Sequence, residues 1–320
     1  MTDSPSLAAH PVAAAGLANG VTAPSSSTAT ATKTEQLNEQ SAAIGEEQRP
    51  DQLPPESSGD RDSSDPSIPP LHVVVADLHH RVQSFLSESF PADSLLARVQ
   101  NQTRISLSVI QTALSRYSLR ELSLSYNGGK DCLVLLILFL ASLHPLHDDQ
   151  GITTIPAIYA LPPHPFASVE DFVRSSSRQY HLSLTRYTTD PPRTTLRSAF
   201  ESYLSLNPSI KAIFVGTRRT DPHGAKLTHF DRTDHGWPDF VRIHPVIDWH
   251  YAEIWAFIRH LGIPYCSLYD EGYTSLGGTN DTHPNPKLRV DATGSSSGEQ
   301  QTYRPAYELT EDDEERLGRH

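Results

Sequence analysis

The sequence predicts an α/β fold, with a parallel twisted sheet and helices on both faces, in residues 69–320. From Glu121 onward, short runs with strand character alternate with helix-like segments. This alternation favours a parallel sheet, because parallel neighbours are joined through helical crossovers. One apolar run, residues 132–141, is long enough for a buried helix. In such sheets the ligand binds beyond the carboxyl ends of the strands, so the loops there are expected to carry the site.

Residues 1–68 differ in composition from the rest of the chain. They contain no Phe, Tyr or Trp and are dominated by Ala, Ser, Thr, Pro, Glu and Asp. Such a stretch buries too little apolar surface to offset its ordering entropy, so we expect a disordered low-complexity tail. Residues 1–66 hold ten acidic and three basic side chains, so −7 of the net charge of −12 lies there and −5 in the remainder. A mildly acidic fold argues against nucleic acid as a partner.

Apolar spacing and turn residues place the individual elements. Helical spacing predicts a first helix over 71–86 and a second one that continues to 114 after a break at Pro91. Strands are expected over 122–125, 152–159, 182–187 and 211–216, and helices over 132–143, 169–180, 194–206 and 252–261. Residues 290–302 are rich in Gly, Ser and Gln and are interpreted as a flexible insertion.

A glycine-rich break separates the first strand from the long apolar helix. It reads Tyr126-Asn127-Gly128-Gly129-Lys130-Asp131. A strand, a glycine turn and a helix place free backbone N–H groups at a helix N-terminus, where an anion can bind. The adjacent glycines and the Asp after the Lys distinguish this break from the common phosphate loop. An ordinary tight turn is the alternative interpretation.

A second informative loop follows the strand at 211–216. It contains Gly216-Thr217-Arg218-Arg219-Thr220-Asp221-Pro222 and, further on, Arg232-Thr233-Asp234-His235-Gly236-Trp237-Pro238-Asp239-Phe240-Val241-Arg242. Two arginines at a strand end suit a phosphate, because the guanidinium fork matches its oxygens. Trp237 offers a face for a planar ring. A loop anchored by a buried Trp is the alternative.

These stretches resemble a known family. The first is similar to the PP-loop of ATP pyrophosphatases, with Asn127 in place of the usual Ser, in the form found in eukaryotic FAD synthases of the sulfonucleotide-reductase-like branch. The second is similar to the flavin-side motif of that family. Segments 268–278 and 303–319 resemble the family's glycine-rich and terminal segments. The resemblance covers residues 71–319 and implies an adenine-nucleotide alpha-hydrolase-like, Rossmann-like domain, in the stand-alone arrangement of fungal forms.

The resemblance implies an FMN adenylyltransferase, which transfers AMP from ATP to FMN and gives FAD and pyrophosphate. Mg²⁺ is the implied cofactor, held mainly by the phosphates, with Asp131 as a further ligand. The implied catalytic residues are Asn127, Lys130, Asp131, Arg218 and Arg219. The implied ATP and pyrophosphate site comprises Ser125, Tyr126, Asn127, Gly128, Gly129, Lys130, Asp131, Tyr159, Arg316 and Arg319. The implied FMN site comprises Arg218, Arg219, Asp221, Asp234, Trp237 and Arg242.

The acidic run at residues 311–315 departs from the family's form. By composition it would be a solvated tail, and five successive acids would repel ATP. Whether this tail closes the site is left open by the sequence.

Within the glycine-rich loop at 126–131, we expect Lys130→Ala and Asp131→Ala to lose turnover while the fold stays intact.

Two other functions stay open. A sulfonucleotide (PAPS) reductase needs a nucleophilic Cys in its C-terminal segment, and no Cys follows Cys266. A non-catalytic flavin-nucleotide-binding protein would bind FMN and leave ATP unconsumed. Cys132 and Cys266 are the two cysteines of the chain, so neither a zinc site nor a disulfide framework is expected. We expect a cytoplasmic monomer. No membrane partner is expected, because no apolar run reaches the length of a membrane span.

Overall fold

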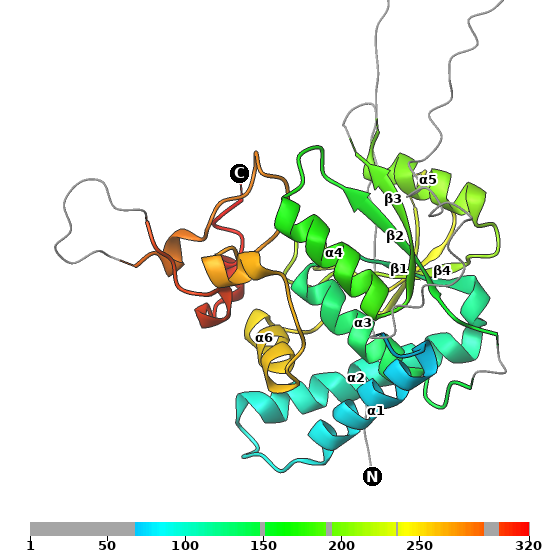
Figure 1. Cartoon of the computed structure of the whole chain (residues 1–320), viewed down its shortest axis with the longest axis horizontal. Helices are drawn as coiled ribbons and strands as arrows, with labels where there is room; N and C mark the ends of the chain where they lie inside the picture. Colours follow the sequence, from blue (N-terminus) through cyan, green and yellow to red (C-terminus); the bar gives the residue numbers. More distant parts are fainter. Residues whose placement is uncertain (1–67, 148–150, 190–193, 235, 291–300, 320) are drawn as a thin grey trace, which may run out of the picture. The chain divides into compact units, whose positions relative to one another are not determined.

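A computed structural model describes residues 68–147, 151–189, 194–234, 236–290 and 301–319. Figure 1 shows these residues as a twisted sheet with helices packed against it. Apart from Ile68, the expected disordered tail lies outside the described residues, and so does most of the expected insertion at 290–302. The tail and the insertion therefore stay predictions.

In the described part of the chain, six strands form one sheet in the order β3-β2-β1-β4-β6-β5. The strands are β1 Leu122–Ser125, β2 Ile155–Leu161, β3 Leu182–Thr188, β4 Ala212–Phe214, β5 Phe230–Arg232 and β6 Val241–Ile243. All neighbours pair in parallel except β5, which pairs antiparallel with β6. The predicted parallel sheet is thus confirmed. The sequence does not predict β5 and β6, because runs of three residues carry no readable alternation.

The strand order changes direction at β1. From this strand, β2 and β3 continue to one side while β4 lies on the other, with Leu124 paired to Ala157 of β2 and to Phe214 of β4. At such a switch point the loops after the two central strands diverge and leave a crevice at the carboxyl edge. The loops after β1 and β4, which carry both motifs of the sequence, therefore meet at this edge.

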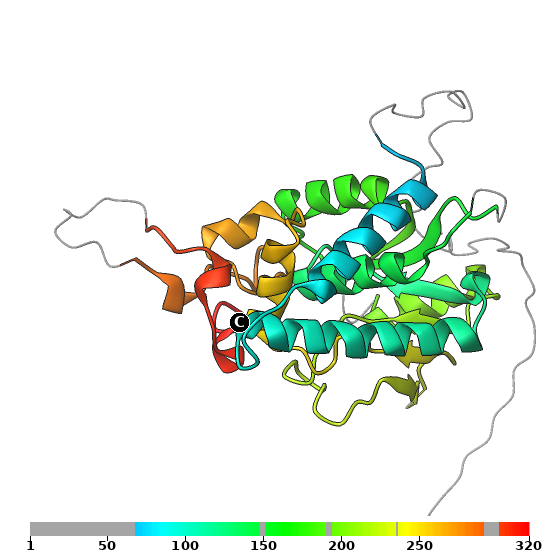
Figure 2. The same cartoon turned by 90° about the horizontal axis from the view of Figure 1, so that it is seen from below.

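Helices cover both faces of the sheet, as predicted (Figure 1). On one face lie α3 Lys130–Ser142 and α4 Ala167–Gln179, and on the other lies α5 Leu196–Leu206. Strand β2 shows the division, because Ala157 and Tyr159 belong to the core of the first face and Ile158 to that of the second. A further layer packs outside α3 and consists of α1 Leu71–Ser87, α2 Leu95–Arg116 and α6 Tyr251–His260 (Figure 2).

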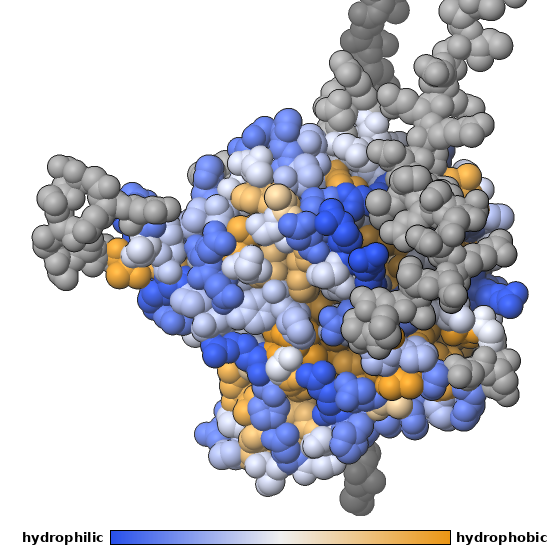
Figure 3. Space-filling model, viewed as in Figure 1, coloured by the Kyte–Doolittle hydropathy of each residue, from blue (hydrophilic) through white to orange (hydrophobic). Residues whose placement is uncertain are grey.

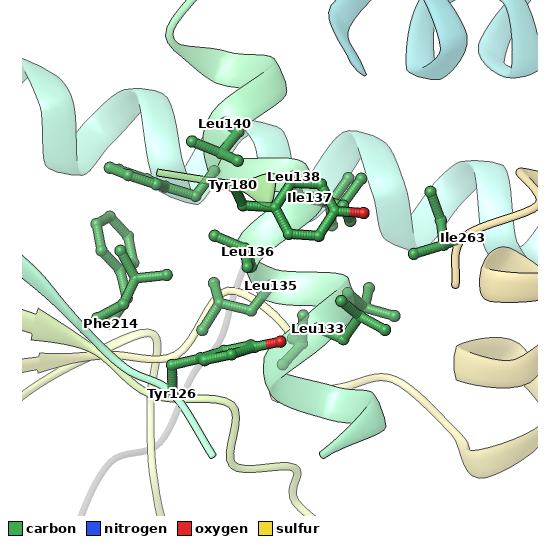
Figure 4. Packing of buried hydrophobic residues seen from close by; sticks show 14 of the residues in the cluster. Tyr126, Leu133, Leu135, Leu136, Ile137, Leu138, Leu140, Tyr180, Phe214 and Ile263 are labelled. Carbon is green, nitrogen blue, oxygen red and sulfur yellow. The ribbon is translucent and has the colours of Figure 1, made fainter. Parts of the chain in front are cut away.

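Helix α3 is enclosed by the rest of the fold. Every residue from Leu133 to Ser142 is buried. Figure 4 shows Tyr126 and Phe214 on the sheet side of this helix, and the rings of Phe139 and Phe214 are 4.9 Å apart. Burying a leucine side chain contributes about 1.5–3 kcal/mol, so this helix is held firmly against the sheet. The loop between β1 and α3 consequently has a rigid support at both ends.

Polar residues cover most of the face shown in Figure 3, with apolar residues visible between them. Among the described residues, the large apolar side chains that are exposed are Val73, Ile105, Leu196, Leu206, Val290 and Leu317. Among the described helices, none combines the length and the apolar character needed to span a membrane.

Candidate active site

The glycine-rich break forms the turn from β1 into α3. Gly128 adopts a φ of +72°, a left-handed conformation that favours glycine. Asn127 closes the turn, since its Oδ1 accepts a hydrogen bond from the N–H of Gly129 at 2.9 Å. Tyr126 is buried behind the turn, and its N–H donates to the carbonyl of Ile158 at 2.9 Å. The turn is therefore fixed by backbone and side-chain hydrogen bonds.

We expect Gly128→Ala to raise the KM for the nucleotide that the sequence resemblance implies by about tenfold or more, because the loop must shift. A Cβ at Gly128 would lie 2.8 Å from Cγ2 of Val173, and the positive φ adds about 1–2 kcal/mol of strain. Gly151→Ala is a matched control, since Gly151 also has a positive φ but nothing lies within 4 Å of its Cβ position. Steady-state kinetics of both variants would check this. An equal rise in KM in the control would contradict the contact with Val173.

Two buried cations, Lys130 and Arg218, lie beside the turn. Nζ of Lys130 donates to Oδ2 of Asp131 at 3.0 Å and also contacts the carboxylate of Glu315. Arg218 is fully buried and its guanidinium contacts the same two carboxylates. It reaches a third, Oδ1 of Asp312, at 3.3 Å. Oδ1 of Asp131 lies 2.8 Å from Nε of Arg218 but without the angle of a hydrogen bond.

The cations and the carboxylates of this cluster shift each other's pKa values. Burial alone lowers the pKa of Lys130, but the charges of Asp131 and Glu315 outweigh it, so the pKa is raised. Burial alone raises the pKa of Asp131, but Lys130 and Arg218 outweigh it, so the pKa is lowered. Lys130 and Asp131 therefore both carry their charge at neutral pH.

The C-terminal strap, residues 311–319, crosses the site. Figure 1 shows it beside α6 and the chain that follows this helix. Oδ1 of Asp312 accepts a hydrogen bond from the N–H of Tyr251, at the N-terminus of α6, at 2.7 Å. Thr274 donates to the carbonyl of Glu315 at 2.6 Å, and Asn285 donates to the carbonyl of Glu314 at 2.8 Å. The acidic run is thus docked on the fold through Asp312, Glu314 and Glu315.

A first cavity of about 290 Å³ opens in front of the turn, between the loops after β1 and β4 and the strap. It is lined by Ser125, Asn127, Gly129, Lys130, Asp131, Cys132, Val215, Gly216, Thr217, Asp221, Pro222, Tyr269, Ser275, Leu276, Glu315, Arg316 and Arg319. Its wall holds a helix N-terminus, a lysine and two arginines, which suit a polyanion, and also the carboxylates of Asp131, Asp221 and Glu315.

A second cavity of about 310 Å³ adjoins the first and shares Asn127 and Leu276 with it. It is lined by Asn127, Tyr159, Ala160, Pro162, Pro165, Val169, Thr189, Leu196, Leu276 and Gly277. This lining is largely apolar, as in sites for planar organic groups. The hydroxyl of Tyr159 donates to Oε1 of Glu170 at 2.6 Å, which holds its ring in the wall.

Comparison with known proteins identifies the family to which this sequence is similar. Residues 121–284 match the family described as "Phosphoadenosine phosphosulfate reductase domain". A probable FAD synthase from Schizosaccharomyces pombe is 38% identical over 245 residues, which cover 76% of this chain and 87% of that protein. The chain belongs to the FAD synthase family.

Solved structures of this family agree with the fold. The Candida glabrata FMN adenylyltransferase in complex with FMN and the ATP analogue AMPCPP is 31% identical, with a TM-score of 0.72 over 79% of this chain and 98% of that one. The yeast FAD synthetase in complex with FAD is 30% identical, with a TM-score of 0.69 over 79% of this chain and 100% of that one. The predicted membership of the PP-loop superfamily is confirmed by these matches.

The structure of this FAD synthase family member gathers most of the predicted ATP-side residues at one place. The residues that line the first cavity are Ser125, Asn127, Gly129, Lys130, Asp131, Arg316 and Arg319. Tyr159 lines the second cavity. Tyr126 is buried behind the turn and Gly128 forms part of it, and neither lines the first cavity. Their contacts with ATP stay predictions.

The predicted FMN-side residues are more dispersed. Asp221 lines the first cavity, and Arg218 lies beneath it. Arg219 instead points to Asp248, with 2.6 Å between Nε and Oδ1, and lines neither of the two cavities. Arg242 lies on β6, where it pairs with Ile213 in the sheet. Asp234 is exposed, and it likewise lines neither cavity.

Trp237 packs on α5, with its ring 5.9 Å from that of Phe200. Leu196, the first residue of α5, lines the second cavity. The Trp237 loop therefore adjoins the second cavity through α5 without lining it. A role of this loop in binding a flavin ring stays a prediction.

Sequence reasoning missed the residues that hold the cluster together. They are Tyr269, Thr274, Asn285, Asp312 and Glu315. Tyr269 accepts a hydrogen bond from the N–H of Lys130 at 2.9 Å. Tyr269 and Thr274 fall within the glycine-rich segment at 268–278, which was the one available signal. Nothing in the acidic run distinguishes Glu315 from its neighbours.

Proposed function

We propose that this chain is an FMN adenylyltransferase, which makes FAD and pyrophosphate from FMN and ATP. A phosphate oxygen of FMN attacks the α-phosphorus of ATP, the bond to the bridging oxygen breaks, and pyrophosphate leaves. The observation that carries the proposal is the pair of adjoining cavities joined at Asn127, one polar with charged side chains of both signs and one largely apolar. The relatives that the chain matches over most of its length include one solved with FMN and an ATP analogue.

The reaction joins two anionic substrates, so positioning and charge neutralisation are the main tasks of the enzyme. Lys130 lines the first cavity and uses two of its three protons on Asp131 and Glu315, which leaves one for a phosphate. Arg316 and Arg319 border the same cavity and are placed to neutralise the leaving pyrophosphate. No covalent nucleophile is required.

We propose Mg²⁺ as the cofactor. Among the described residues, no group of three or more His, Cys, Asp or Glu side chains is arranged to hold a metal ion. Mg²⁺ can bind without such a group when substrate phosphates supply most of its ligands, because it uses few carboxylates and retains waters. Asp131 lines the first cavity and is the carboxylate we propose as the protein ligand; its Oδ1 lies 2.8 Å from Nε of Arg218, so a bound ion would share this carboxylate with the arginine. The bound ion would neutralise charge on the phosphates.

Incubation of the purified chain with FMN and MgATP tests the proposal. FAD and pyrophosphate should appear in equal amounts by chromatography and by a pyrophosphate assay, and excess EDTA should stop both. Absence of both products from well-folded protein would overturn the adenylyltransferase. Binding of FMN without consumption of ATP would favour a non-catalytic flavin-binding protein.

The match over residues 121–284 makes a sulfonucleotide reductase the second candidate. That chemistry needs a thiolate nucleophile. Cys132 lines the first cavity, but burial and the neighbouring Asp131 raise its pKa to about 12. Cys266 is buried, and burial raises its pKa as well. Both thiols therefore stay protonated at neutral pH, which argues against this candidate.

We expect iodoacetamide to label Cys132 slowly at pH 8, where a pKa of about 12 leaves roughly one thiol in 10⁴ ionised. Because the folded state retains the proton, the rate should rise about tenfold per pH unit through pH 9 and 10. In the denatured chain the rate should level off near the ordinary thiol pKa of about 8.5. Mass spectrometry of timed samples measures both. A plateau below pH 9 in the folded protein would contradict the raised pKa.

We also propose that the chain acts as a monomer in the cytoplasm, without nucleic acid or membrane partners. Both cysteines are free thiols, the state that a reducing compartment maintains. The net charge of −12 disfavours a nucleic-acid surface. Light scattering of the purified chain and microscopy of a fluorescent fusion test the two parts of this proposal.

A further inference from the structure

The five acidic residues at 311–315 have different environments. Glu315 is 4% exposed and is the one member of this run that lines the first cavity. Its two carboxylate oxygens divide between the two buried cations, with Oε1 on Lys130 and Oε2 on Arg218. Glu314 instead pairs with the exposed Lys287 at 2.6 Å, and neither residue lines the cavity. Glu315 thus has a contact with the reaction site that Glu314 lacks.

The backbone around Glu315 is also tied down. Thr274 holds its carbonyl at 2.6 Å, and the N–H of His283 donates to the carbonyl of Gly318 at 2.8 Å. These bonds fix the strap on both sides of Arg316. A buried carboxylate is stable only when it is paired, so Lys130 and Arg218 favour the docked position of Glu315 over a solvated one.

The strap that contains Glu315 also carries two arginines. Arg316 follows Glu315 directly, and Arg319 comes one turn later, where it donates to the carbonyl of Leu276 at 2.8 Å and packs on Gly277. Both arginines line the first cavity. The charge of Glu315 is matched by two cations, so the strap brings Arg316 and Arg319 to the cavity without an unpaired negative charge from Glu315.

We propose that Glu315 is a positioning residue for adenylyl transfer. Its carboxylate holds Lys130 and Arg218 and docks the strap, so that Arg316 and Arg319 face the phosphates of ATP. This inference rests on the proposed function. It gives one acid of the run a role in ATP binding. The composition of the run, taken alone, argues against ATP binding.

The variants E315A and E315Q, with E314Q as the matched control, test this role. In E315A we expect the KM for ATP to rise about tenfold or more while the KM for FMN stays within about twofold. E315Q retains the shape and one acceptor oxygen, so its KM for ATP should lie between that of E315A and that of the wild type. E314Q should match the wild type, because its partner Lys287 is exposed.

Amide hydrogen exchange of residues 311–319 supplies a readout that needs no substrate. Exchange of this segment should be about tenfold faster in E315A than in the wild type and unchanged in E314Q. If E315A does not fold, E315Q provides the same comparison in a less perturbed protein. Since exchange needs no turnover, an inactive wild type that still shows faster exchange in E315A would overturn the proposed function and not the docking.

Two results would overturn the role of Glu315. The first is unchanged exchange together with an unchanged KM for ATP in E315A. The second is a lower KM for ATP in E315A, because Glu315 would then compete with a phosphate for Lys130 and Arg218.

Discussion

Lys130→Ala is expected to lower FAD formation by about 10³-fold and the free energy of unfolding by about 3–5 kcal/mol. The loss of activity follows from removing the cation at the turn, beside the first cavity. The loss of stability follows from burial, since the lysine is 2% exposed and its removal leaves Asp131 and Glu315 to share Arg218. The sequence leads us to expect an intact fold for this variant, and the buried cluster revises that expectation.

Urea unfolding followed by tryptophan fluorescence measures the stability, because Trp249 and Trp255 are buried in the core. Chromatographic detection of FAD measures the activity. Lys287→Ala is the control, as this lysine also pairs with a glutamate of the strap but is 55% exposed. It should leave unfolding and turnover unchanged. An unfolding midpoint for Lys130→Ala equal to that of the wild type would contradict the pairing of Lys130 within the cluster.

Arg218→Met should lower the free energy of unfolding by about 3–5 kcal/mol, because it removes the central partner of a buried ionic cluster. Arg218 is fully buried and contacts Asp131, Asp312 and Glu315. Methionine matches the aliphatic part of arginine but lacks the guanidinium, so the variant removes the charge and its hydrogen bonds together. Turnover should fall as well, since Asp131 and the strap lose a common anchor.

Arg219→Met is the matched control for this variant. Arg219 is the next residue in the chain, half exposed, and paired with Asp248 outside both cavities. The free energy of unfolding, measured with urea, should therefore fall in Arg218→Met and stay unchanged in Arg219→Met, although the sequence motif alone does not distinguish the two arginines. Adding E315Q to Arg218→Met should cost less than E315Q alone, because it removes a carboxylate that has lost a partner. Additive losses would contradict the coupling of Arg218 to Glu315.

The kinetics of Arg219→Met also test its predicted role at the FMN phosphate. An unchanged KM for FMN would place this residue outside the flavin site. In the structure its guanidinium is occupied by Asp248 and by the carbonyls of Ala225 and Leu227. Binding of a phosphate by Arg219 would require these contacts to be exchanged.

The elements that could be predicted are those with a strong local signal. The helix at 132–143 was predictable because a run of large apolar residues has a stable position only inside the fold, and α3 runs from Lys130 to Ser142. Boundaries were less accurate. Strand β2 begins at Ile155 and not at 152, because Ile155 is the first residue to pair with Leu182 of β3. Pairing between strands decides such limits, and a single segment does not contain that information.

The strap shows the opposite case. Its acidic composition predicts a solvated tail, yet Asp312 binds the N-terminus of α6 and Glu315 lies between two buried cations. The partners of Glu315 lie 185 and 97 positions away in the chain. Local composition cannot reveal cations that lie so far away in the chain. The acidic run alone therefore predicts a solvated Glu315, whereas this residue is buried.

The sequence by itself determined the parallel α/β class, the glycine-rich turn at Asn127–Asp131 and the family, because the signals for these lie in short stretches of the chain. The tertiary structure alone decided which charged residues share the site. It buries Arg218 and leaves Arg219 half exposed, and it selects Glu315 from five successive acids. The physical reason is that a charge is retained inside a protein only beside its partners, and folding brings those partners together from distant segments.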